Sequence, residues 1–250
     1  MIEAAPAILA GYLTGKATEL VESTFRENVI ERWSRYRARQ FFEEFCSAVT
    51  EPDSTDDDIH AKLEELFSDE HRSEVMFDAY RSVCLTKSKI LGPRIIAILT
   101  AEIVARDSIA TADEEAMFAA AELMSDAELI EMANEIESYR LKAERGDDDE
   151  CKYHGACAQP NIAVSAGSDT FNSDTPCPVG PLDLTESFGR WAENLKRAGL
   201  LADSVETLNC EYAEDGGKYR EVTWSIYILL AATRLATIVQ RLRPLVPASP

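Results

Sequence analysis

Apolar residues recur at steps of three and four along most of the first 145 residues, and this period fits helices rather than strands. Between Val29 and Cys46, for example, the aromatic and aliphatic side chains fall on one side of a helix. The same spacing predicts helices over 8–25, 27–49, 56–67, 70–86, 89–107, 112–123 and 126–144. The first half of the chain is therefore expected to be a helical bundle.

Local signals fix where several of these helices begin. Thr111 and Ser125 are each followed three residues later by a glutamate, Glu114 and Glu128, which is the pattern of a capping box. Pro93 is compatible with its helix only in the first turn, because an interior proline removes a hydrogen bond and clashes with the preceding turn. The helix that contains it is therefore expected to start close to residue 89.

The second half of the chain is predicted to contain a loop and strands as well as helices. Residues 146–181 show no sustained period and are expected to form a long inserted loop. An amphipathic helix is predicted from Leu184 to a glycine cap at Gly199. Two strand-like runs at 204–212 and 218–228, joined by a turn rich in Asp and Gly, predict a β-hairpin, and a last helix follows at 229–243.

Together these elements predict a mainly α fold with two domains. Residues 1–123 form the helical bundle, and residues 124–250 form a winged-helix-like α+β domain with one β-hairpin and the insertion at 146–181. The order of helix, hairpin and helix in the second domain is that of the back half of a winged helix.

Two short motifs carry a resemblance. Thr86-Lys87-Ser88-Lys89 precedes an apolar helix, and Arg197-Ala198-Gly199-Leu200-Leu201 precedes the hairpin. In these respects the chain resembles a loose group of uncharacterised bacterial and prophage proteins with a helical N-terminal half and a winged-helix-like end. The resemblance covers about residues 25–145 and 184–243 and implies a fold, but the group supplies no activity or active-site residues. The insertion at 146–181 departs from the group's pattern.

Charge narrows the choice of partners. The formal net charge is −20, and residues 51–150 carry ten Lys and Arg against twenty-seven Asp and Glu, so this segment holds −17 of the total. Such a chain is poorly suited to bind nucleic-acid phosphates or anionic lipid, because like charges repel. Hydrophobic residues make up 46% of the sequence and charged residues 28%, which is typical of a globular protein.

The sequence shows neither an export signal nor a membrane span. Glu3 stands where a signal peptide carries a cation, and Arg234 interrupts the longest apolar stretch, at 224–239. We therefore expect a cytoplasmic protein with no membrane partner. Cys46, Cys84 and Cys210 lie singly in apolar stretches and are expected to be buried free thiols.

The sharpest local feature of the insertion is a group of metal-ligand residues. Cys151, His154 and Cys157 recur at intervals of three, and Cys177 follows after a further loop. Two thiolates, an imidazole and a distant fourth sulfur can satisfy tetrahedral zinc, which would give the insertion a reason to fold. The alternative, which we favour, is a surface loop that contains cysteines without metal.

The only basic cluster comprises Arg26, which precedes the second predicted helix, and Arg32, Arg35, Arg37 and Arg39 within it. It could bind phosphate or nucleic acid, but the acidic segment that follows makes internal ion pairing the better interpretation.

Winged helices bind DNA or proteins, and charge discriminates between the two. Arg190, Lys196 and Arg197 are the candidate contacts on the predicted helix, whereas Glu214 and Asp215 occupy the hairpin tip. Residues 185–250 carry eight Lys and Arg and eight Asp and Glu, and a net charge of zero is poor for a module that neutralises phosphates.

No catalytic signature is present: the sequence has no glycine-rich phosphate loop, no nucleophile elbow and no zinc-protease helix. We therefore expect a non-enzymatic regulatory or scaffolding protein that acts through protein contacts or self-association, in a prophage or defence setting. The alternatives are a DNA-binding winged-helix regulator and a zinc-stabilised module.

Overall fold

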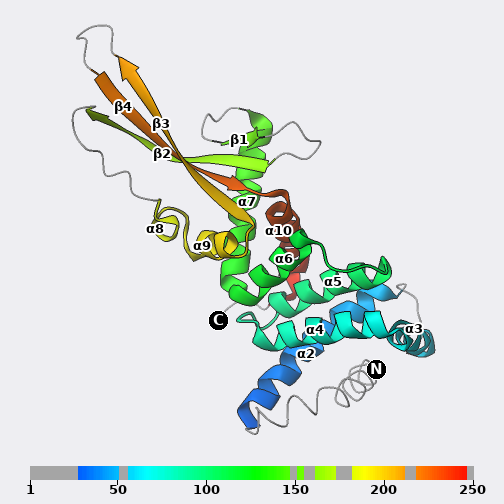
Figure 1. The fold of residues 1–250 in the computed structure, drawn as a ribbon. Coiled ribbons are helices and arrows are strands. Elements are labelled where there is room, and N and C mark those ends of the chain that lie inside the picture. The colour runs from blue at the N-terminus through cyan, green and yellow to red at the C-terminus, as the bar shows by residue number, and fades with distance from the viewer. Residues whose placement is uncertain are drawn as a thin grey trace. The chain divides into compact units, whose positions relative to one another are not determined.

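The computed structural model describes residues 28–50, 56–146, 151–154, 161–172, 182–211 and 218–246. Its contacts divide the chain into two compact units, residues 1–129 with 241–250 and residues 130–240 (Figure 1). The predicted helix at 8–25 lies outside the described residues. The predicted division into domains 1–123 and 124–250 stays a prediction.

The first unit is a bundle of helices whose bounds agree closely with those predicted from periodicity. They are α2 (Asn28–Val49), α3 (Asp56–Ser68), α4 (Glu70–Leu85), α5 (Leu91–Ala105), α6 (Ala112–Leu123) and the start of α7 (Asp126–Arg145). Phenylalanines of α2 form the aromatic part of its core: Phe41 stacks on Phe45 with 5.9 Å between ring centroids, and Phe42 stacks on Tyr80 of α4 at 6.1 Å.

Helix α5 is the central element of this bundle. Every residue in it is buried except Arg94, Glu102 and Ala105, and α2, α4 and α6 all pack against it. Pro93 is its third residue, in the first turn, as predicted.

Both predicted capping boxes are present. The Glu114 backbone N–H donates to the Thr111 hydroxyl at 3.3 Å, and the Glu114 carboxylate accepts from the Thr111 backbone N–H at 2.9 Å. The same reciprocal pair joins Ser125 and Glu128 at 3.3 and 2.8 Å. These bonds satisfy N–H groups that the first turn of a helix leaves unpaired, and they fix the starts of α6 and α7.

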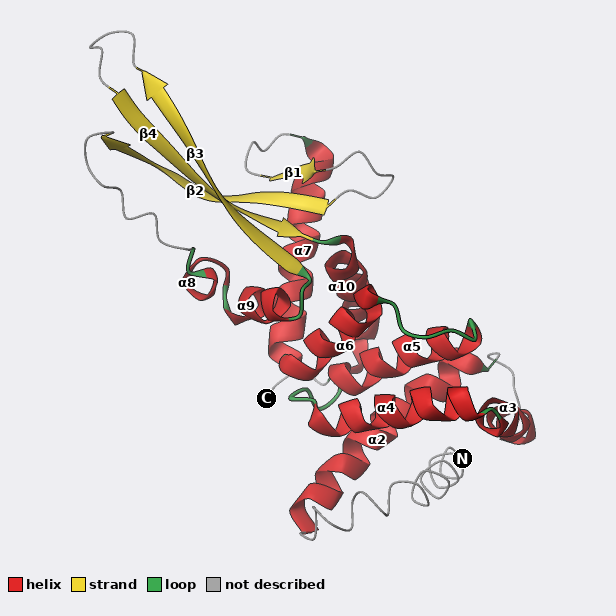
Figure 2. Cartoon of the chain, viewed as in Figure 1, coloured by secondary structure: helices red, strands yellow, loops and turns green. Residues whose placement is uncertain are grey.

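The second unit combines the rest of α7 with a four-stranded antiparallel sheet and three further helices (Figure 2). Its elements are β1 (Cys151–His154), β2 (Asn161–Asn172), α8 (Leu184–Phe188), α9 (Arg190–Arg197), β3 (Leu201–Glu211), β4 (Lys218–Ile228) and α10 (Leu230–Leu242). A short 3₁₀ helix, Arg243–Leu245, follows in the first unit.

The sheet corrects the prediction that residues 146–181 form a loop. Two parts of that segment are strands: β2 pairs with β4 from Ile162 to Asn172, with a register shift between Ser165 and Gly167, and β1 pairs with the first four residues of β2. Among the β2 side chains that the structure describes, Ile162 and Val164 alternate as buried apolar residues, and so short an alternation is a weak strand signal in a sequence. The hydrogen bonds of β4, whose residues lie 47 to 66 positions after their partners in β2, make the rest of β2 a strand.

A second correction concerns the helix predicted from 184 to 199. Gly189 interrupts it with φ +98° and ψ 172°, a conformation open almost only to glycine, and α8 and α9 lie on either side. Gly199 ends α9 as predicted, because its N–H donates to the Lys196 carbonyl and the Leu200 N–H to the Leu195 carbonyl, a Schellman motif.

The chain is thus a mainly α protein with a helical bundle and a smaller α+β part. In the second unit α7 is followed by strands β1 and β2, then by helices α8 and α9 and by the hairpin of β3 and β4, and the sheet order is β1-β2-β4-β3. The last hairpin strand therefore lies between the first long strand and its own hairpin partner, which is the winged-helix arrangement. Within the described residues, no helix is both long and apolar enough to cross a membrane.

Candidate interaction surface

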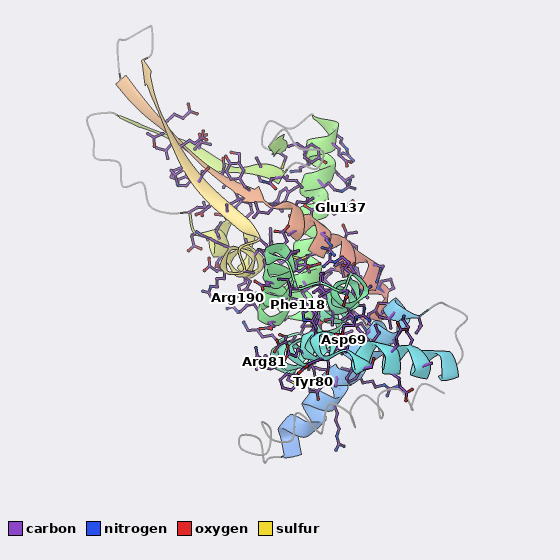
Figure 3. The ribbon with its side chains drawn as sticks, turned by 45° about the vertical axis from the view of Figure 1, so that its right-hand side comes forward. Asp69, Tyr80, Arg81, Phe118, Glu137 and Arg190 are labelled. Atoms are coloured by element: carbon purple, nitrogen blue, oxygen red, sulfur yellow. The ribbon has the colours of Figure 1, made fainter. Side chains whose placement is uncertain are left out.

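Helix α9 is amphipathic and separates the predicted contact residues from the core. Trp191, Ala192, Asn194 and Leu195 are buried, whereas Arg190, Lys196 and Arg197 are exposed. Arg190 is the first residue of α9 and is labelled in Figure 3. The three cations predicted from sequence therefore do lie on the outer side of one helix.

Two of these cations are held by carboxylates of the same unit. The Lys196 Nζ lies 2.9 Å from the Asp203 Oδ2 at the start of β3. The Arg197 Nε lies 3.1 Å from the Glu193 Oε1, one turn earlier in α9. Each pair is partly exposed and so contributes little to stability, but it neutralises a charge that a phosphate contact would need.

The charged side chains of strand β3 are all acidic. Asp203, Glu206 and Glu211 are its only charged residues, and the strand has no Lys, Arg or His. Glu206 is exposed, and Val205 beside it is 40% exposed, one of the larger apolar side chains that the described residues leave open to solvent.

We call Arg190, Glu193, Lys196, Arg197 and Asp203 the α9–β3 face. Its three cations and two carboxylates give a net charge of +1, and two of the cations are paired. A surface of mixed sign with internal ion pairs suits a protein partner, because such a partner can present a matching pattern of both signs.

The four residues of the metal hypothesis are only partly described. Cys151 is buried in β1 as a free thiol, opposite Val164 of β2, and His154 ends that strand with its Cα paired to Asn161. Cys157 and Cys177 lie outside the described residues. Among the residues that the structure does describe, no three Cys, His, Asp or Glu side chains gather as a metal ion would require. The zinc site stays a prediction.

The basic cluster of α2 makes contacts within the first unit. The Arg37 Nε donates to the Ser88 carbonyl at 3.1 Å, and the Arg39 Nε donates to the Glu43 carboxylate at 2.8 Å. Arg26 and the side chain of Arg32 lie outside the described part. The predicted pairing of this cluster with the acidic segment 51–150 stays a prediction, and one partner of Arg39 is a glutamate of its own helix.

An ion-pair cluster joins α2 to α5 through an arginine that the cluster prediction did not include. Arg94, with 13% of its side chain exposed, pairs with Glu44 at 2.8 Å and Glu43 at 3.1 Å, and its Nε donates to Gln40 at 2.9 Å. All three of these bonds of the Arg94 guanidinium go to side chains of α2, so we assign the cluster a structural role.

The thiols of the first unit are shielded. Cys46 and Cys84 are free and half-buried. Burial raises the pKa of Cys46 to about 11, and it raises the pKa of Cys84 in spite of a hydrogen bond with Tyr80 and the nearby charge of Arg37. Both are therefore protonated at neutral pH and poor nucleophiles. The side chain of Cys210 is outside the described part.

No protein-family model matches this chain, and no curated protein or solved structure matches it either.

Sequence reasoning found the cations of this surface but missed the carboxylates that hold them. Asp203 lies in a run predicted only as a strand, and its pairing with Lys196 depends on the Schellman turn at Gly199 and Leu200. Glu193 was visible in principle, because it precedes Arg197 by four residues in a helix.

Proposed function

We propose that this chain is a non-enzymatic regulatory or scaffolding protein that binds another protein through its α9–β3 face. The proposal rests on one observation above others: Lys196 and Arg197, two of the three cations on the outer side of α9, are already paired with Asp203 and Glu193. DNA binding would have to break these pairs to gain phosphate contacts, whereas a protein partner can use both signs as they stand.

The resemblance to bacterial and prophage proteins supports a prophage or defence setting, and the free thiols of Cys46, Cys84 and Cys151 fit a cytoplasmic location, where thiols stay reduced. A DNA-binding regulator is the competing function, and the ion pairs of the α9–β3 face argue against it.

The test is site-specific photo-crosslinking in the native host. A benzophenone amino acid is placed at position 190, at position 206 and, as a control, at Asp113 in α6 of the first unit, which is exposed. We expect one protein to crosslink at 190 and 206 and not at 113. The purified partner should then bind the wild type and lose affinity for Arg190→Glu.

The same purified chain is tested for retardation of duplex DNA at low salt. Salt-sensitive retardation that is lost in Arg190→Ala with Arg197→Ala would support the DNA-binding regulator and overturn the proposal.

A further inference from the structure

Strand β3 is the edge of the sheet, since it pairs with β4 on one side and is last in the order β1-β2-β4-β3. It runs eleven residues, from Leu201 to Glu211, about twice the length of an ordinary strand. Along one side it presents the alternating backbone N–H and C=O groups of an unpaired edge, with no other described strand beside it (Figure 2).

Apart from its three acidic side chains, this edge lacks the devices that usually prevent strand addition. Its register with β4 is continuous from Leu201 to Glu211, without a bulge, and it contains neither proline nor lysine. Natural proteins blunt exposed edges with short strands, bulges, prolines and lysines.

The opposite side of the sheet provides a comparison within the same unit. There β1 covers the first four residues of β2, and a register shift between Ser165 and Gly167 interrupts β2 directly beyond them. A bulge of this kind twists an edge away from incoming strands. A short strand and a bulge thus interrupt that edge, whereas β3 is long and has no bulge.

The side chains of β3 define what a strand added there must carry. Val205 and Glu206 are neighbours in a strand, so they lie on opposite faces of the sheet, and both are exposed. On an added strand, a basic residue opposite Glu206 would be favoured, and so would an apolar residue at the neighbouring position, opposite Val205. Asp203 is engaged by Lys196, which leaves Glu206 as the exposed acid in the described middle of the strand.

We propose that the β3 edge binds an extended segment of a partner protein, in which basic and apolar residues alternate, as a fifth strand of the sheet. This inference rests on the proposed function and specifies its contact. A second copy of this chain is a poorer occupant, because two β3 strands would bring six carboxylates and no cation together.

The probe is a fluorescent peptide in which lysine and valine alternate, with threonines at its ends, added to the full-length chain at low ionic strength. Binding is measured by anisotropy. Two further peptides carry N-methyl groups on one or the other set of alternate backbone amides. Because alternate N–H groups of a strand point to opposite sides, strand addition predicts that one methylated peptide binds like the parent and the other does not bind.

Glu206→Lys should weaken binding of the parent peptide about tenfold, because an attractive cross-strand pair becomes a repulsive one. Glu115→Lys, at an exposed position of α6, changes the net charge by the same amount and should leave binding unchanged. Circular dichroism checks that both variants fold. A peptide of the same composition with its lysines and valines in separate blocks should bind at least tenfold more weakly.

Equal binding of the two methylated peptides, an unchanged affinity in Glu206→Lys, or a dimer that excludes the peptide and forms through β3 would each overturn the inference. If that happens while position 190 still crosslinks to a protein, the proposed function stands and only its contact at β3 is wrong. Loss of crosslinking at both 190 and 206 would remove the proposed function itself.

Discussion

The Asp126 carboxylate accepts a hydrogen bond of 2.5 Å from the hydroxyl of Ser88, which lies 38 residues earlier in the chain. The same carboxylate accepts from the backbone N–H groups of Lys89, Ile90 and Leu91, at 3.1, 3.3 and 2.8 Å. Ser88 in turn accepts from the Gly92 N–H at 2.6 Å. The first residue of α7 thus serves as the cap of α5, whose preceding residue Ile90 has no capping side chain of its own.

Asp126→Ala should therefore destabilise the protein by about 2 kcal/mol, because it leaves several N–H groups at the start of α5 without an acceptor. Urea unfolding followed by circular dichroism measures the change. Asp113→Ala removes an exposed aspartate from the first turn of α6 and should cost less than about 0.5 kcal/mol. Equal losses of unfolding free energy in the two variants would show that the hydrogen bonds of Asp126 to Ser88 and to the start of α5 contribute nothing to stability.

Glu114 should make stability depend on acid pH. Its side chain is 1% exposed, and although burial alone would raise the pKa of this carboxyl, hydrogen bonds from Thr111 and Arg106 lower it below the usual glutamate value. A lowered native pKa stabilises the fold above the unfolded value of about 4.3, and that contribution is lost as the pH falls through the native pKa. In Glu114→Gln we expect lower stability at pH 7 and a shallower loss of stability below pH 4, measured by urea titration at several pH values. Parallel curves for variant and wild type would contradict this.

Gly189→Ala should destabilise the second unit by about 2 kcal/mol. Its φ of +98° strains any side chain, and a Cβ there would lie 3.2 Å from the Glu131 Oε1 and 3.4 Å from the Trp191 Cδ1. Gly199 has a φ of +79° with nothing within 4 Å of a Cβ, so Gly199→Ala should cost only about 1 kcal/mol. Tryptophan fluorescence during urea unfolding compares the two, and a larger loss in Gly199→Ala would refute the packing argument.

Cys46 should react slowly with iodoacetamide at pH 7.5 in the folded protein, because burial raises the pKa of its thiol to about 11. Mass spectrometry of the peptide that contains Cys46 measures the alkylated fraction against time. In 6 M guanidinium chloride the same peptide should be alkylated at least tenfold faster, and equal rates in the two conditions would show that the thiol is open to solvent.

The sequence by itself determined the features whose causes lie within one or two helical turns. The bounds of α6, both capping boxes, Pro93 in the first turn of α5 and the glycine cap at Gly199 depend only on near neighbours, so spacing and residue type predict them. The positions of Arg190, Lys196 and Arg197 on the outer side of one amphipathic helix follow from the same period.

Only the tertiary structure decided what depends on partners far along the chain. Strand β2 forms because it pairs with β4, and Asp126 caps the start of α5. Asp203 neutralises Lys196 across a turn. The tertiary structure also decided that Gly189 separates α8 from α9, because the amphipathic sequence pattern is the same whether a helix continues through this glycine or ends at it. Hydrogen bonds and charges between distant segments leave no period in a sequence, and so the fold class was predictable whereas the surface that α9 and β3 form together was not.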